Sequence, residues 1–446
     1  MSQARFSQPY ETLRAMAAEV LEHARKNGAS GCDTEISEGY GQTVTVRRGE
    51  VETIEYNRDK GLGVSVYIGK KKGFASSADL SPRAIKDTVA AALSIARFTA
   101  SDDSAGLADV EDLCREVHDL DLFHPWDLAV EEAIELAQRC EAAAFALDPR
   151  VVNSEGASVS CQQSHFVLAN SLGFSGGFSS SQHYLSCSVI VAEDEHMQRD
   201  DWYVSRRVPG ELPDPETVGD YAGRRALARM RSRKIGTTQA PVLFEAPVAS
   251  GLISSFVSAV SGGNLYRKSS FLLDSIGKQV FSPIVNLVER PHLPRAQASS
   301  WFDDEGVATR DREVVKGGVV QGYFLGSYSA RKLGMKTTGN AGGNHNLILQ
   351  PGDRDLPGLL KQMGRGLLVT ELMGQGMNLV TGDYSRGAAG YWVEGGEIQY
   401  PVEEITIAGN LKDMFRAIVG IGNDVLARGS RQCSSILIER MTIAGD

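Results

Sequence analysis

The sequence predicts an α+β protein, in which an N-terminal α/β half precedes a β-rich C-terminal domain. An amphipathic helix, several strands with alternating polarity and a second helix follow one another in residues 11–98. The same order of elements recurs between about residues 125 and 233, and from residue 236 onward glycine pairs separate short β-rich runs. We therefore expect an N-terminal domain at 1–235, with sub-lobes 1–105 and 113–235, and a C-terminal domain at 236–446.

The first helix–strands–helix unit begins with apolar residues at helical spacing from Glu11 to Lys26, which Asn27-Gly28 ends. Ser81 and Pro82 then favour the start of a second helix that runs to Phe98. Between these helices, period-2 patterns predict strands, and turn residues predict hairpins at Gly49-Glu50 and Asn57–Gly61. The predicted strands are Thr43–Arg48, Val51–Tyr56, Leu62–Ile68 and Gly73–Ser77.

The second unit begins with an amphipathic helix from about Pro125 to Ala146 and closes with a helix from about Pro215 to Arg233. Two interpretations stay open, namely two related lobes or a single sheet built from both units. The polar, acidic stretch Thr99–Asp112 is the expected joint between them. The predicted strands of this unit are Val151–Ser158, Ser160–Leu168, Ser180–Ala192 and Trp202–Arg207.

Composition excludes some classes of protein. The net charge is −10, and the longest run of basic residues is Lys70–Lys72, so we expect no nucleic-acid partner. No stretch approaches the ~18 apolar residues of a membrane span. The N-terminus lacks an apolar signal region, and the six cysteines form no C-x-x-C pair, so we expect a cytoplasmic protein.

In the glycine-rich half we predict helices at Pro247–Val260 and Asn410–Ile418.

Conventional catalytic signatures are weak in this chain. None of the eight histidines lies four or five residues from another, although a composite metal site from distant histidines stays open. Cys433 would need a neighbouring base to act as a nucleophile, and the nearest preceding histidine is His345. Asp303–Gly306 is either an acidic turn or a set of oxygen ligands for a cation. Gly173–Gly177 lies between predicted strands, which favours a loop over a nucleophile elbow.

Several ordered motifs resemble those of the TldD/PmbA peptidase family, and within it the PmbA (TldE) type of subunit. The resemblance extends over the whole chain and is strongest after residue 240. Its motifs are Leu265–Ser270, Asp304–Gly306, Ala330-Arg331 with Gly334, Thr338–Asn340, Gly376–Asn378, Thr381–Trp392, Pro401–Asn410 and Ile418–Asp424.

The resemblance implies an altered metal motif. TldD-type subunits carry a His-Glu-x-x-x-His helix that binds zinc and hydrolyses peptide bonds. If Glu245 matches the glutamate of that motif, Phe244 and Ala249 occupy the histidine positions. If Gly251-Leu252 is the anchor instead, Glu245 and Ser250 occupy them. Neither register supplies two imidazoles, so the resemblance implies no cofactor in this chain, and zinc in a TldD-type partner.

The resemblance also implies a subunit that pairs with a TldD-like protein, forming a heterodimer that cuts unfolded peptides. This chain would shape the chamber and hold substrate. A glycine-rich β domain suits main-chain pairing with an extended peptide, and candidate groove residues are Asp383, Tyr384, Arg386, Tyr391 and Trp392, which could instead be packing residues. Two alternatives stay open: an autonomous metallopeptidase with an atypical metal site, and a non-enzymatic peptide-binding homodimer.

Overall fold

The computed structural model describes residues 6–445, which form two units. Unit 1 contains the chain up to Ala228, together with Pro294–Ala296 and Trp301–Thr309. Unit 2 contains Arg229–Leu293, Gln297–Ser300 and the chain from Arg310. The break therefore falls earlier than the boundary expected after residue 235, and two segments of the expected C-terminal domain belong to unit 1.

Unit 1 is built on one antiparallel sheet, with the strand order β3-β2-β1-β4-β6-β7 and β5 beside β4. Strands β1 and β4 come from the two repeated units and pair from Asp33↔Asn170 to Val46↔Ala157. Of the two interpretations left open, the single shared sheet is thus the one observed. The strands are β1 (Gly31–Arg47), β2 (Glu50–Ile68), β3 (Lys71–Ser77), β4 (Val151–Asn170), β5 (Ser175–Gly176), β6 (Ser179–Glu193) and β7 (His196–Arg206).

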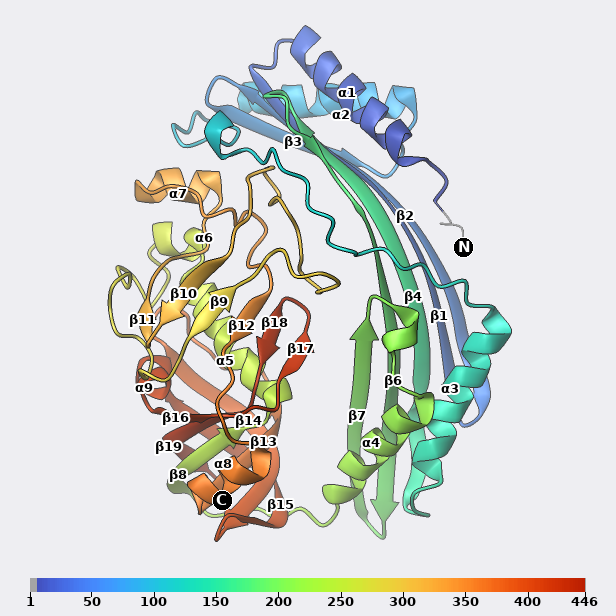
Figure 1. The fold of residues 1–446 in the computed structure, drawn as a ribbon, viewed down its shortest axis with the longest axis vertical. Coiled ribbons are helices and arrows are strands. Elements are labelled where there is room, and N and C mark those ends of the chain that lie inside the picture. The colour runs from blue at the N-terminus through green and yellow to red at the C-terminus, as the bar shows by residue number, and fades with distance from the viewer. Residues whose placement is uncertain (1–5, 446) are drawn as a thin grey trace. The chain divides into compact units, whose positions relative to one another are not determined.

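The central strands are longer than the local sequence indicates (Figure 1). No turn forms at Asn57–Gly61, because these residues pair with Gly41–Ser37 of β1. The two strands predicted at 151–158 and 160–168 are likewise one strand, β4. Pairing with a long neighbouring strand has overridden turn-like composition, as tertiary context commonly does for β structure.

Four α-helices cover one face of this sheet. Alternate residues of β1 from Thr34 to Val46 are buried on that face, and Leu13 and Val20 of α1 share a core with Ile36. The third helix begins at Val130 rather than at Pro125. At its start, the Glu132 carboxylate accepts a hydrogen bond from the Ala129 amide at 3.2 Å. The helices are α1 (Tyr10–Lys26), α2 (Pro82–Phe98), α3 (Val130–Phe145) and α4 (Pro215–Ala228), with short 3₁₀ turns η1 (Val110–Asp112) and η2 (Pro209–Glu211).

Unit 2 contains a small barrel. Strand β15 pairs with both β14 and β19, so the order β15-β14-β13-β8-β19 closes on itself, and β16 extends it beside β19. Only β8 and β13 are parallel among these neighbours. The strands are β8 (Thr238–Phe244), β13 (Gly366–Met373), β14 (Asp383–Glu394), β15 (Glu397–Asn410), β16 (Ile418–Ile421) and β19 (Ile436–Ala444).

A second sheet of unit 2 has the order β11-β10-β9-β12-β18-β17. Its strands are β9 (Leu287–Glu289), β10 (Arg312–Lys316), β11 (Val319–Val320), β12 (Leu347–Leu349), β17 (Leu426–Arg428) and β18 (Arg431–Cys433). The helices of unit 2 are α5 (Ala246–Ala259), α6 (Gly262–Tyr266), α7 (Ser327–Leu333), α8 (Leu356–Met363) and α9 (Leu411–Arg416). Helices α5 and α9 confirm the two helices predicted here, and the α+β class is confirmed.

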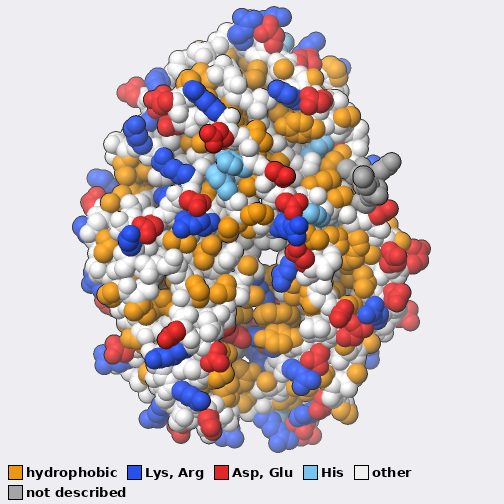
Figure 2. All heavy atoms as spheres, in the orientation of Figure 1, with side chains coloured by type: hydrophobic (Ala, Val, Ile, Leu, Met, Phe, Trp, Pro, Cys, Tyr) orange, Lys and Arg blue, Asp and Glu red, His pale blue; other side chains and the backbone are white. Residues whose placement is uncertain are grey.

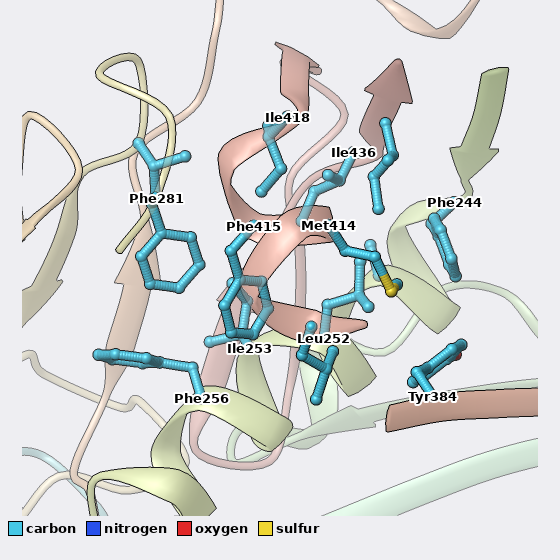
Figure 3. Close-up of a cluster of buried hydrophobic side chains, with 14 of the residues drawn as sticks. Phe244, Leu252, Ile253, Phe256, Phe281, Tyr384, Met414, Phe415, Ile418 and Ile436 are labelled. Carbon is cyan, nitrogen blue, oxygen red and sulfur yellow. The ribbon is translucent and has the colours of Figure 1, made fainter. Parts of the chain in front are cut away.

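The core of unit 2 is aromatic around α5 (Figure 3). The Phe281 ring lies 4.4 Å from that of Phe415 and 5.0 Å from that of Phe256, between centroids. Such rings bury large areas and hold α5 firmly against the barrel.

Two surface properties bear on function. In the part of the chain that the structure describes, no helix has the length and apolar character needed to cross a membrane. On the face drawn in Figure 2, acidic and basic side chains are interspersed rather than gathered by sign. That face offers no basic track of the kind that follows a phosphate backbone.

Candidate functional site

The segment expected to correspond to the metal motif lies where strand β8 passes into helix α5. Glu245 is the residue before the helix, and its amide donates a hydrogen bond to the Val369 carbonyl at 3.0 Å. Phe244 and Ala249 are both fully buried in the core of unit 2, and Figure 3 shows Phe244 among the side chains of that cluster. In this register, both histidine positions of the motif hold hydrocarbon side chains that carry no ligand atom.

The second register does not suit zinc either. The Ser250 hydroxyl donates to the Pro247 carbonyl at 3.0 Å, within the helix. A serine hydroxyl is a poor zinc ligand beside imidazole or thiolate. In residues 6–445, no group of three His, Cys, Asp or Glu side chains is arranged to hold a metal ion. Phe244, Ala249 and Ser250 therefore offer no side chain of the kind that zinc prefers.

A polar chain fixes the start of α5 instead. The Ser435 hydroxyl accepts a hydrogen bond from the Ala246 amide at 3.0 Å and donates to the Asp424 carboxylate at 2.6 Å. The same carboxylate accepts from the Ser435 amide at 3.0 Å. An amide at a helix N-terminus is stabilised by a nearby acceptor and a negative charge. Sequence reasoning missed Ser435, which lies outside the family motifs. Its partner Asp424 is the last residue of one of them.

Cys433 is unsuited to nucleophilic catalysis. Its side chain is buried, and burial raises the pKa of the thiol to about 12. At neutral pH the group is therefore a neutral thiol, whereas the thiolate is the reactive species. The nucleophile hypothesis for this cysteine is not supported by its surroundings.

A second buried network organises the motif loop around Asn340. The buried Glu289 carboxylate accepts from Arg312 at 2.6 Å, from the Asn340 side chain at 2.9 Å and from the His345 amide at 2.7 Å. His345 Nε2 lies 3.0 Å from the Gly339 carbonyl. The Glu289 carboxylate thus links β9 to β10 and to the loop that holds Asn340 and His345. Glu289 and Arg312 carry no signal in the sequence, because they meet only through tertiary pairing.

The acidic turn has a structural explanation as well. Asp303 is buried, and its carboxylate accepts from the Glu305 and Val307 amides at 2.9 and 3.0 Å. Gly306 has a φ of +79°, which favours glycine at the end of such a turn. Of the two interpretations of Asp303–Gly306, these contacts support an acidic turn rather than a set of ligands for a cation.

The predicted groove residues lie on β14 but differ in exposure. Tyr384 and Trp392 pack in the core of unit 2, so these two side chains are packing residues rather than open groove residues. Burial raises the pKa of Tyr384 to about 12. Asp383 is exposed, and hydrogen bonds from Thr381 and Asn410 lower the pKa of its carboxyl. Arg386 and Tyr391 are half-buried. The structure therefore places Tyr384 and Trp392 in the core of unit 2 and leaves Asp383 on the surface.

Unit 1 carries a polar trough on the sheet face opposite its helices. The cavity has a volume of ≈ 550 Å³ and is lined by residues of β4, β6 and β7, most of which alternate along their strands. We call it the serine trough. Its lining residues are Glu155, Gly156, Ser158, Ser160, Tyr184, Ser186, Cys187, Ser188, Arg199, Asp201 and Tyr203.

The serine trough is almost neutral in its centre. Ser158 and Ser160 exchange hydrogen bonds with Thr45 and Thr43 of β1, at 2.8 and 2.9 Å. At one end, Glu155 accepts from Ser188 at 3.0 Å and from Arg199 at 2.6 Å. Hydroxyl groups both donate and accept, so this surface suits the amide and carbonyl groups of a peptide main chain. Sequence reasoning missed the trough, although alternating serines in β4 and β6 were a visible signal.

Comparison with known proteins identifies related families and folds. Residues 32–96, 123–230 and 237–445 match the models for domain 1, the central domain and the C-terminal domain of the PmbA/TldA metallopeptidases. The chain is 51% identical to metalloprotease PmbA of Escherichia coli O157:H7, covering 94% of this chain and 93% of that protein. It is 46% identical to a metalloprotease PmbA homolog of Haemophilus influenzae, covering 98% and 97% of the two chains.

Solved structures agree with these matches. A Bacteroides thetaiotaomicron protein, solved as a candidate modulator of DNA gyrase, has a TM-score of 0.93 at 27% identity, covering 98% of this chain and 100% of that chain. TldE from Thermococcus kodakarensis has a TM-score of 0.81 at 18% identity, covering 96% and 100%, and shares the fold. A metalloprotease TldD homolog of H. influenzae is 24% identical over 83% of this chain and 80% of that protein.

Proposed function

The chain belongs to the PmbA/TldD metallopeptidase family, and from this premise we propose that it is a PmbA-type (TldE) subunit that holds peptide substrate. A TldD-like partner in a heterodimer would supply the zinc and cleave unfolded peptides. The observation that carries the proposal is the pair Phe244 and Ala249, which are buried hydrocarbon side chains at the motif's histidine positions in one register. In this proposal the chain needs no cofactor of its own.

The serine trough supports the holding role. Its hydroxyl groups would hydrogen-bond to peptide main chain, and main-chain recognition depends little on side-chain sequence. Apart from Tyr184 and Tyr203, its lining is made of small or charged side chains, which favours polar or flexible segments over folded hydrophobic ones. The predicted groove on β14 stays a second hypothesis for substrate contact through Asp383, Arg386 and Tyr391. We expect the protein to act in the cytoplasm, since all six of its cysteines are free thiols.

The first experiment measures zinc content and peptidase activity together. The purified chain, a TldD-type partner and their mixture are each incubated with an unfolded reporter peptide. We expect the chain alone to carry no stoichiometric zinc and to be inert, and the mixture to cleave faster than the partner alone. Stoichiometric zinc with chelator-sensitive cleavage by the chain alone would instead establish an autonomous metallopeptidase.

A second arm separates substrate holding from a purely structural role. Ser186→Trp fills the serine trough, and Val152→Trp adds the same ring at an exposed position of β4 outside it. We expect Ser186→Trp to raise the KM of the mixture several-fold with little change in kcat, because the binding that is lost contributes equally to the ground state and the transition state. An unchanged KM, or an equal effect of both variants, would remove the trough from the proposal. Peptide binding without cleavage in any mixture would favour the non-enzymatic alternative.

A further inference from the structure

The first eleven residues of β2 form an unusually open edge. Every residue from Glu50 to Lys60 is exposed, whereas burial begins at Leu62. On one side these residues pair with β1, and β3 pairs with β2 only from Leu62 onward. Within residues 6–445 no strand occupies the other side of Glu50–Lys60. Its backbone groups are therefore available for pairing with another strand.

Exposed apolar side chains accompany this open edge. Val51, Ile54 and Tyr56 are 42%, 43% and 54% exposed. Edge strands are usually protected by being short or by carrying proline or inward charges. Glu50–Lys60 is long and contains no proline, and its protective features are a bulge opposite Val46 of β1 and charged side chains such as Glu55 and Lys60. An open edge that presents β-branched and aromatic residues is suited to strand addition.

Counted on alternate residues, the charges of this segment are separated by sign along the strand, while Glu55 and Asp59 add two acidic groups on the intervening residues. Glu50 and Glu52 lie at its start, and Arg58 and Lys60 lie at its end. Parallel pairing with an identical strand would place like charges against each other. Antiparallel pairing about Glu55 places Glu50 opposite Lys60, Glu52 opposite Arg58 and Ile54 opposite Tyr56, each pair occurring twice. Opposite charges and aromatic–β-branched pairs both stabilise neighbouring strands.

We propose that the edge Glu50–Lys60 binds the same edge of a second copy of this chain, in antiparallel register about a two-fold axis at Glu55. The pairing joins the two seven-stranded sheets of unit 1 into one continuous sheet. The contact is isologous, so it closes as a dimer and does not propagate. Its small area makes it a weak, concentration-dependent contact. It does not rest on the peptidase proposal, since it uses residues outside the motif and the trough.

Charge reversal provides the main test. Glu50→Lys with Glu52→Lys makes the edge basic, and Arg58→Glu with Lys60→Glu makes it acidic. We expect sedimentation velocity to show a reversible dimer for the unaltered chain. For each reversed variant alone, the dimer dissociation constant should be at least tenfold higher, because the two-fold symmetry then places like charges opposite each other. An equimolar mixture of the two variants should dimerise again, since each reversed charge then faces a charge of opposite sign.

A matched control and several outcomes make the test decisive. Lys86→Glu reverses an exposed charge on α2, away from the edge, and should leave dimerisation unchanged. The proposal fails if the unaltered chain stays monomeric across the concentration range. It also fails if the reversed variants dimerise normally, because the dimer then uses another surface. Reversals that leave self-association unchanged but abolish association with a TldD-type chain would assign the edge to that partner instead.

A crosslink tests the register directly. Glu55→Cys places two thiols on the two-fold axis, where opposite Cβ atoms of paired strands lie close enough for a disulfide. The six native cysteines are buried or half-buried, so they give little background. We expect mild oxidation to link most Glu55→Cys dimers, and Glu52→Cys, which lies off the axis, to link far less. Equal crosslinking of both variants would overturn the proposed register.

A second consequence follows from Glu55 meeting its own copy. Two carboxylates directly opposite each other destabilise paired strands. Glu55→Gln removes this repulsion and keeps the size of the side chain. We expect it to lower the dimer dissociation constant several-fold. A higher dissociation constant for Glu55→Gln would contradict an axis at this residue.

Discussion

Asp33 illustrates how a single half-buried side chain affects unit 1. It lies on β1, and burial raises the pKa of its carboxyl to about 6. Lys72 and a hydrogen bond from Ser65 lower this pKa, and Glu305 raises it further. The folded state therefore binds the proton more tightly than the unfolded state does. In the window between the unfolded pKa of ~3.9 and about 6, stability falls as pH rises.

Replacing this residue should reverse the penalty. We expect Asp33→Asn to stabilise the protein by about 2 kcal/mol at pH 8, because the amide does not ionise. At pH 5 the gain should be clearly smaller, since the folded carboxyl is then mostly protonated. Urea unfolding followed by circular dichroism at the two pH values measures both numbers. The same gain at both pH values would show that the effect is not a matter of ionisation.

Two other residues show what burial does to apparent catalytic groups. The sequence offered Cys433 as a candidate nucleophile and His345 as the nearest histidine before it. The thiol of Cys433 is buried, and the His345 ring lies against the Gly339 carbonyl while its amide binds Glu289. Both side chains are parts of the packing of unit 2.

Helical glycines differ sharply in the space around them, which matters at the level of whole elements. In α4, a Cβ on Gly219 would overlap the Cys140 carbonyl oxygen of α3. In α5, a Cβ on Gly251 would have nothing within 4 Å. The first glycine permits two helices to approach closely, whereas the second only lowers helix propensity.

These two positions form a matched pair of substitutions. We expect Gly219→Ala to destabilise the protein by about 1–3 kcal/mol, because the backbone of α3 must shift. Gly251→Ala should stabilise it by about 0.5–1 kcal/mol, the usual difference in helix propensity. Urea unfolding of the two variants compares them under one condition. If both changes proved stabilising, the close approach of α3 and α4 would be disproved.

At the scale of the whole molecule, the chain does not divide into units at one point. Trp301–Thr309 comes after the first part of unit 2 in the sequence but belongs to unit 1. There the Trp301 ring lies 6.5 Å from that of Phe174, and the Phe302 ring lies 5.1 Å from it, between centroids. Val307 forms a β-bridge with Leu113. The core of unit 1 is therefore completed by a segment distant in sequence.

This arrangement predicts that unit 1 depends on its distant segment. We expect Trp301→Ala to cost about 3–5 kcal/mol, as buried aromatic truncations do. Phe98→Ala, at a side chain that is 90% exposed, is the control and should cost less than about 0.5 kcal/mol. A fragment ending at residue 228 should bind a hydrophobic dye more strongly than the full chain. A fragment as stable as the full chain would contradict this dependence.

The sequence by itself determined the α+β class, the helices α1, α2, α5 and α9, and the family, because helical periodicity, capping residues and long motifs are local signals. Only the tertiary structure decided that β2 and β4 are continuous, since pairing along β1 extended them through turn-like residues. The tertiary structure also decided that Tyr384 and Trp392 are buried. It likewise decided which residues bind Glu289 and which strands form the serine trough. Burial and strand neighbours depend on contacts between distant residues, and local sequence does not encode them individually.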